Sequence, residues 1–224
     1  MRAILFGATG MIGSGVLREC LLDARVERVL AIGRAPCGQR HAKLAEIVRA
    51  DLFDLREIEL QLAGYDACFF CLGVSSAGMS EPDYTRVTLD LPLAVARTLV
   101  RVSPSLAFCF ISGAGADSSE RGRTMWARVK GRAENALLAL SPRAVVFRPG
   151  LIQPLHGITS RTRAYRALYA VLGPAFPVLR ALAPGVVTTT ERLGQAMIEA
   201  AAAGAPKRVL ESSDINALAT RRRA

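Results

Sequence analysis

Three glycines near the start of the chain are spaced as a phosphate-binding turn requires. Gly7, Gly10 and Gly13 recur three residues apart, directly after the apolar run 3–6 and at the start of segment 11–22, whose apolar residues have helical spacing. In such a unit the first glycine allows a tight exit from the strand, and the second lets backbone N–H groups approach a pyrophosphate. The third allows close packing of a helix whose N-terminus faces the phosphates. This pattern predicts a dinucleotide-binding site, whose other members within the turn are Thr9, Met11 and Ile12.

The end of the second expected strand determines which dinucleotide is favoured. An acidic residue there would bind the ribose 2′-hydroxyl and repel a 2′-phosphate, but this chain has Arg34. A guanidinium forms charge-assisted, bidentate bonds to phosphate, so we expect Arg34 to bind the 2′-phosphate of NADP, with NAD less favoured. Stacking of Arg34 on the adenine is the alternative. Further along, we expect Asp51 either to accept a bond from the adenine amino group or to cap the following helix.

Motifs at the ends of the expected strands resemble those of the short-chain dehydrogenase/reductase superfamily, in particular its extended and atypical, epimerase-like, NAD(P)-binding members. The resemblance covers most of the chain, and the run 112–137 is similar to that of the TIP-thirty/CC-three oxidoreductase group. Besides the glycine-rich turn, it rests on Asp51-Leu52, Cys71-Leu72-Gly73, Ile111-Ser112-Gly113, Lys130 and Arg148-Pro149-Gly150. It implies a cofactor-bound Rossmann domain whose cofactor also contacts Leu52, Leu72, Gly73 and Pro149.

The chain departs from the superfamily at the catalytic position. The family's Tyr-x-x-x-Lys places both side chains on one helix face, where the lysine lowers the tyrosine pKa. Here Trp126 replaces the tyrosine, and its indole has no proton to exchange near neutral pH. The resemblance implies that Lys130 binds the nicotinamide ribose, the alternative being an exposed helix lysine. It also implies that Ser112 orients a substrate carbonyl, unless Gly113 occupies the family's serine position.

The loss of the tyrosine leaves the proton donor open. Tyr84, Tyr165 and His156 are candidates, although each also has a structural interpretation. His156 is the first to test, because its unperturbed pKa suits proton transfer near neutrality. Loss of a general acid costs about 10²–10⁴ in rate, enough to leave a weak reductase or a non-catalytic binder.

The predicted function is accordingly an NADP-dependent oxidoreductase that acts on a small carbonyl compound of unknown identity. The alternative is a regulatory or scaffold protein that binds NADP(H) without catalysis, which the Trp126 replacement favours. Nucleotide-sugar epimerisation ranks behind both, because it needs the missing tyrosine and a larger C-terminal region.

The elements that must position these residues alternate between strand and helix. Strands are expected at 3–6, 28–32, 46–50, 67–72, 106–111, 144–147 and 208–210. Helices are expected at 11–22, 84–102 with a kink at Pro92, 123–140 and 188–203. The alternation predicts a doubly wound parallel sheet, a three-layer αβα Rossmann fold, with a small helical substrate-side region.

We expect one domain over 1–224, with the substrate-side region inserted at 150–188. Its apolar stretch 165–182 is interrupted by Gly173, Pro174 and Pro177, which makes it a poor transmembrane span. Two short helices that cover the pocket or contact a partner chain are favoured over contact with a membrane surface. The chain is expected to be a monomer or a homodimer.

The composition and the cysteine spacing do not favour a nucleic-acid partner or a metal site. The 224 residues are 51% hydrophobic with a formal net charge of +10, but nothing beyond bulk charge favours a nucleic-acid partner. Cys68 and Cys71 have the spacing of a C-x-x-C motif. A strand would direct their side chains to opposite faces of the sheet, so no metal site is expected. No secretory signal is apparent, and a cytoplasmic location is expected by default.

Overall fold

The structure of the chain is a computed structural model, which describes residues 1–159, 176, 183 and 185–221. Seven parallel strands form one sheet in the order β3-β2-β1-β4-β5-β6-β9. Their bounds are β1 Arg2–Phe6, β2 Arg28–Gly33, β3 Leu44–Val48, β4 Ala67–Phe70, β5 Ala107–Ile111, β6 Ala144–Arg148 and β9 Val209–Glu211. The strand order reverses between β1 and β4, and a crevice for ligands forms at such a switch point in open α/β sheets.

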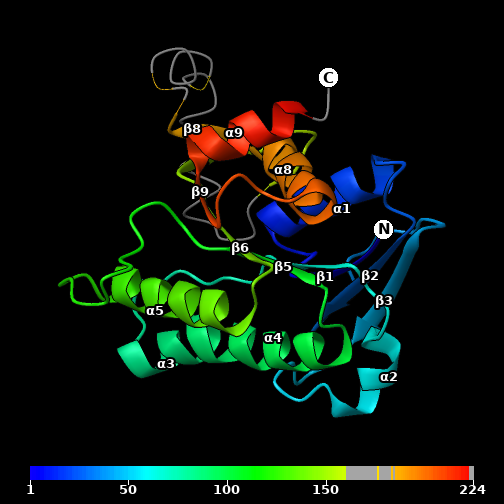
Figure 1. The fold of residues 1–224 in the computed structure, drawn as a ribbon, viewed down its shortest axis with the longest axis horizontal. Coiled ribbons are helices and arrows are strands. Elements are labelled where there is room, and N and C mark those ends of the chain that lie inside the picture. Colours follow the sequence, from blue (N-terminus) through cyan, green and yellow to red (C-terminus); the bar gives the residue numbers. More distant parts are fainter. Residues whose placement is uncertain (160–175, 177–182, 184, 222–224) are drawn as a thin grey trace.

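Helices cover both faces of the sheet, which confirms the predicted doubly wound Rossmann architecture (Figure 1). One face carries α1 (Met11–Leu22), α8 (Thr190–Ala203) and α9 (Ser212–Arg221). The other carries α2 (Glu59–Leu62), α3 (Glu81–Thr85), α4 (Leu91–Val102) and α5 (Met125–Leu140), with the 3₁₀ turn η1 (Arg56–Ile58) before α2.

The two faces of each strand feed two separate hydrophobic cores. In β4, Phe69 packs in the core beneath α1 and α8, whereas Cys68 and Phe70 pack in the core beneath α4 and α5. Cys71 packs against the first core, so the predicted opposite orientation of Cys68 and Cys71 is confirmed. All five cysteines are free thiols. Because both faces of the sheet are buried, the sequences of its strands are nearly continuous apolar runs.

The strand expected at 67–72 ends at Phe70, and the helix expected at 123–140 begins at Met125. Two further elements differ from the expected bounds for identifiable reasons. The third strand spans Leu44–Val48 rather than 46–50, because its parallel register pairs Leu44 with Val29 and Val48 with Gly33. The expected helix 84–102 begins at Glu81, after the N-cap Ser80, and passes through a π-helical turn, η2 (Arg86–Asp90), before α4. The π-helical turn directly precedes α4, whose second residue, Pro92, cannot donate the usual helical hydrogen bond.

The C-terminal third contains elements that the sequence patterns did not indicate. The expected helix 188–203 is divided into a strand, β8 (Val187–Thr189), and α8. A short strand, β7 (Leu151–Gln153), follows β6 and pairs in parallel with β8. α9 was not predicted.

Among the described residues no helix is long and apolar enough to cross a membrane. The expectations for segment 165–182 fall outside the described residues, apart from the buried Phe176. The same holds for Tyr165, one of the three alternative proton donors.

Candidate functional site

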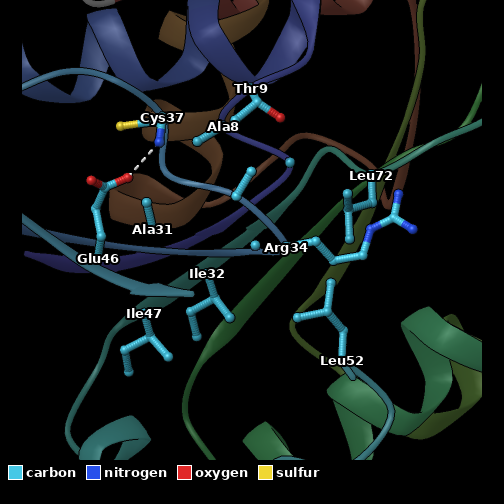
Figure 2. Close-up of a pocket in the computed structure, with 13 residues that line it drawn as sticks. Ala8, Thr9, Ala31, Ile32, Arg34, Cys37, Glu46, Ile47, Leu52 and Leu72 are labelled. Carbon is cyan, nitrogen blue, oxygen red and sulfur yellow. Dashed lines mark hydrogen bonds between the residues drawn. The ribbon is translucent and has the colours of Figure 1, made fainter. Parts of the chain in front are cut away.

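A cavity of about 300 Å³ opens at the carboxyl ends of β1, β2 and β3, at the switch point of the sheet (Figure 2). Its walls contain five of the predicted cofactor residues, which are Gly7, Thr9, Arg34, Leu52 and Leu72. The sequence analysis did not identify the other lining residues, Ala8, Ala31, Ile32, Gly33, Ala35, Cys37, Glu46 and Ile47. The apolar walls with a few convergent polar groups are typical of a site for one end of a nucleotide.

The glycine-rich turn is tightly packed against the sheet. Gly7 has φ of +85°, a conformation that L side chains rarely adopt, and the Gly10 N–H donates to its carbonyl at 3.0 Å. A Cβ at Gly13 would lie 2.0 Å from the Gly7 oxygen, so α1 can approach β1 this closely only with glycine there. Gly10 is the N-cap of α1 and has no side chain to satisfy the first helical N–H groups.

These features fit a dinucleotide pyrophosphate. The start of α1, where Met11 and Ile12 begin the helix, offers backbone donors and the positive end of the helix dipole to an anion. The Ser14 hydroxyl donates to the Ala8 carbonyl at 2.9 Å and holds the turn in place. The residues present are therefore suited to NAD(P), with the adenosine end in the cavity beside them.

Two charged side chains lie on different sides of the cavity. Arg34 lies on the side of Leu52 and Leu72, whereas Glu46 points toward Cys37 (Figure 2). The Cys37 N–H donates to Glu46 Oε1 at 2.7 Å, which fixes the loop after β2. Within the described part of the chain, no carboxylate pairs with Arg34 in a salt bridge, so its guanidinium is available to an anionic ligand.

Asp51 lies outside the cavity lining. Its Oδ1 accepts a hydrogen bond from the Phe53 N–H at 2.8 Å, so the side chain stabilises the turn after β3. Neither Gly73, which follows β4, nor Pro149, which follows β6, lines this cavity. The Pro149 carbonyl accepts from the Ala114 N–H at 3.0 Å, which joins the carboxyl ends of β5 and β6.

Helix α5 places Trp126, Lys130 and Glu134 one turn apart along one face. Lys130 is half-buried, with Nζ 5.8 Å from the centroid of the Phe110 ring. Among the described residues, no hydrogen-bond acceptor or carboxylate contacts this ammonium. Burial lowers the pKa of Lys130 from 10.5 to about 8, and the negative charge of Glu134 opposes part of that shift.

Ser112 takes part in a buried polar network rather than facing an open site. Its hydroxyl donates to Glu134, which is fully buried and also accepts from Arg148 Nε at 3.0 Å. Arg148 donates further to the Ser118 hydroxyl at 2.5 Å. By contrast, a Cβ at Gly113 would meet no atom within 4 Å, so Gly113 has the free space that a side chain pointing at a substrate would need.

Two of the alternative proton donors are engaged elsewhere. Tyr84 is 2% exposed and belongs to the core beneath α4 and α5. His156, in the loop after β7, pairs through Nε2 with Glu191 Oε2 at 2.8 Å in the first turn of α8. That hydrogen bond lowers the pKa of Glu191. Glu19 of α1 approaches the same pair, so His156 faces the α1/α8 interface.

Comparison with known proteins agrees with this geometry. The sequence profile of the NAD dependent epimerase/dehydratase family matches residues 3–121. Protein FMP52, mitochondrial, of Eremothecium gossypii is 31% identical over 157 residues, which are 68% of this chain and 66% of the relative. Protein HTATIP2 of Rattus norvegicus is 28% identical over 151 residues, covering 66% and 61% respectively, which confirms the resemblance to the TIP-thirty group. The chain thus spans about two thirds of the length of these relatives.

Solved structures with the same fold include epimerases of nucleotide sugars. UDP-glucose 4-epimerase of Thermotoga maritima superposes with a TM-score of 0.65 at 14% identity, over 89% of this chain and 73% of the epimerase. The Bordetella bronchiseptica enzyme WbmF, solved with NAD⁺, gives 0.65 at 15% identity, over 98% and 77%. At these identities the likeness demonstrates the shared fold alone.

The relatives also correct one expectation. Those of the FMP52 group are named mitochondrial, which contradicts the cytoplasmic location. The expectation was wrong because lack of a secretory signal bears on secretion only and does not distinguish the cytoplasm from an organelle.

With a glycine-rich turn packed on β1, a nucleotide-sized cavity at the switch point and a profile match over more than half of its length, this chain belongs to the NAD-dependent epimerase/dehydratase family.

Proposed function

We propose that this chain is an NADP-dependent oxidoreductase that acts on a small carbonyl compound. The observation that carries the proposal is Arg34, which pairs with no carboxylate of the described residues and lines the cavity where NAD-selective proteins have an acidic residue. When bound, the reduced cofactor supplies a hydride. Arg34 would bind the 2′-phosphate, and the N-terminus of α1 would bind the pyrophosphate. Lys130 would hold the ribose hydroxyls at the nicotinamide end.

The proposal predicts that Arg34→Asp reverses the cofactor preference. A lost charge-assisted contact and a new repulsion should weaken NADPH binding by about 10- to 100-fold, since each 1.4 kcal/mol is tenfold in affinity. NADH has no 2′-phosphate, so its affinity should change by less than about threefold, on the same scale. Titration of both nucleotides, monitored by fluorescence or calorimetry, measures the two constants.

Arg40→Asp is the matched control for this experiment. Arg40 is exposed in the same loop but does not line the cavity, and its replacement changes the net charge by the same amount. We expect nearly unchanged NADPH affinity for this variant at moderate salt, because salt screens the charge of an exposed side chain that does not line the cavity. Equal losses of NADPH and NADH in Arg34→Asp would contradict the phosphate-binding role.

A second candidate function is a protein that binds NADP(H) as a structural or sensing ligand without turnover. Trp126 favours it, because an indole cannot act as the general acid at the family's tyrosine position. A scan of aldehydes and quinones with bound NADPH separates the two functions. Saturable binding without oxidation of NADPH by any of them would favour the sensing function. A ligand at a hundredfold its Kd should stabilise the fold by about 2.7 kcal/mol. If neither NADPH nor NADH raised the melting temperature at such a concentration, both candidate functions would be contradicted.

A further inference from the structure

The face of α5 that carries the family's catalytic pair retains only one group able to transfer a proton. Trp126 has an indole N–H that does not exchange as an acid, and Glu134 is fully buried and bonded to both Ser112 and Arg148. Lys130 lies between them, one turn from each. Its ammonium has three N–H donors. Among the described residues none of these donors has an acceptor.

The other candidate donors of the described chain are enclosed in a core or engaged in other hydrogen bonds. Tyr84 is enclosed in the core, and His156 is held by Glu191 at the α1/α8 interface on the opposite side of the sheet from α5 (Figure 1). Ser112 is committed to Glu134. The group that remains on this face of α5 is thus Lys130, which in the superfamily only assists the tyrosine.

We propose that the ammonium of Lys130 is itself the general acid of the carbonyl reduction, in place of the missing tyrosine. The proposal rests on the oxidoreductase function proposed above. The half-buried position beside the Phe110 ring supports it, because an apolar neighbour limits the access of water that would otherwise compete for the proton. One N–H can bind a ribose hydroxyl while a second faces the substrate oxygen.

The proton balance is simple. The carbonyl carbon gains the hydride of the reduced cofactor, the carbonyl oxygen gains a proton from Lys130 Nζ, and the C=O bond becomes an alcohol. Lys130 is left as a neutral amine and regains its proton from water. Burial lowers the pKa of Lys130 to about 8, so both the ammonium and the neutral amine are accessible near neutral pH. A general acid works best when its pKa lies near the working pH. Glu134 is the charged group of the described residues that acts on this titration.

The first test measures Lys130 without any turnover. The chain contains only three lysines, Lys43, Lys130 and Lys207, so lysine labelled with ¹³C at the ε position gives three NMR signals. Lys130→Arg assigns the signal of Lys130 by its loss. We expect this signal to titrate near pH 8 in the cofactor-free protein. A midpoint at the ordinary lysine value near 10.5 would overturn the proposal.

The second test separates proton transfer from cofactor binding. Lys130→Arg keeps the positive charge and the N–H donors but stays protonated at every working pH. We expect NADPH affinity within about threefold of wild type, and single-turnover oxidation of NADPH by a small aldehyde slowed by about 10²–10⁴-fold. Trp126→Tyr in the Lys130→Arg background should restore at least about tenfold of that rate, because a phenol again supplies the proton.

The outcomes distinguish the two proposals. If Lys130→Arg reduces the aldehyde at the wild-type rate with the wild-type pH profile, Lys130 is not the acid although the oxidoreductase function stands. If the wild-type protein binds NADPH but reduces no carbonyl compound, the oxidoreductase function fails and this proposal fails with it.

Discussion

Replacing Gly13 by alanine is expected to remove both the cofactor site and much of the stability of the fold. The added Cβ would lie 2.0 Å from the Gly7 oxygen and 2.6 Å from the Gly7 carbonyl carbon, far inside van der Waals contact. Both atoms belong to backbone, so relief requires α1 to move away from β1. Overpacking of this kind costs typically about 1–3 kcal/mol, and we expect the upper end because no side chain can give way. Chemical denaturation and NADPH titration measure the two losses.

Gly10→Ala is the control within the same turn. A Cβ there would lie 3.5 Å from the Gly7 oxygen, an ordinary contact, and Gly10 has an unstrained φ of −84°. The free energy of unfolding should therefore change by less than about 0.5 kcal/mol without cofactor. NADPH binding should still weaken, since the methyl group would occupy the space through which the pyrophosphate approaches the backbone. A Gly13→Ala protein with wild-type stability would contradict the close approach of α1 to β1.

Removing the carboxylate of Glu134 is expected to be among the most destabilising single changes in the chain. Glu134 is fully buried, and its loss leaves the Arg148 guanidinium, which is 13% exposed, without its main partner. Removal of one member of a buried ion pair costs about 3–5 kcal/mol, because the remaining charge is uncompensated. We expect a loss of this size for Glu134→Ala in urea unfolding, together with loss of the acceptor for Ser112.

The same arginine provides a matched control. Glu211 also pairs with Arg148, but at 3.4 Å and with 45% of its side chain exposed. Exposed pairs contribute about 0–1 kcal/mol, so Glu211→Ala should lower the free energy of unfolding by no more than about 1 kcal/mol. Similar losses in the two variants would indicate that Arg148 is stabilised by its total surroundings rather than by the buried carboxylate.

The first half of the fold could be predicted because its signals are local. The helix expected at 11–22 matches α1, since a glycine turn marks its start and apolar residues recur with helical period. The buried strands β4 and β5 were found as short, wholly apolar runs. In the same way, Arg34 was placed at the cavity because it follows a clear strand directly.

The remaining features depend on partners distant in the sequence. The register of β3 is determined by its pairing with β2, and β7 and β8 form a ladder across 36 residues that no local pattern announces. The role of Glu134 was missed for the same reason, because its partner Arg148 lies on a strand rather than on the same helix. A local signal existed, since Glu134 follows Lys130 by one helical turn and thus shares its buried face.

The β7/β8 ladder has a consequence for how this chain can diversify. Leu151 pairs with Val187 and Gln153 with Thr189, so two segments that are 36 residues apart in the chain lie side by side. The Leu151 N–H donates a hydrogen bond to the Val186 carbonyl at 3.1 Å. The Gly150 N–H donates to the Ser212 hydroxyl at 2.8 Å, which joins the start of this ladder to α9. Once the ends are held, each doubling of the enclosed length costs only about 0.6 kcal/mol of closure entropy. We therefore expect changes in the number of residues between β7 and β8 to cost little closure entropy, because the hydrogen bonds of the ladder hold both ends.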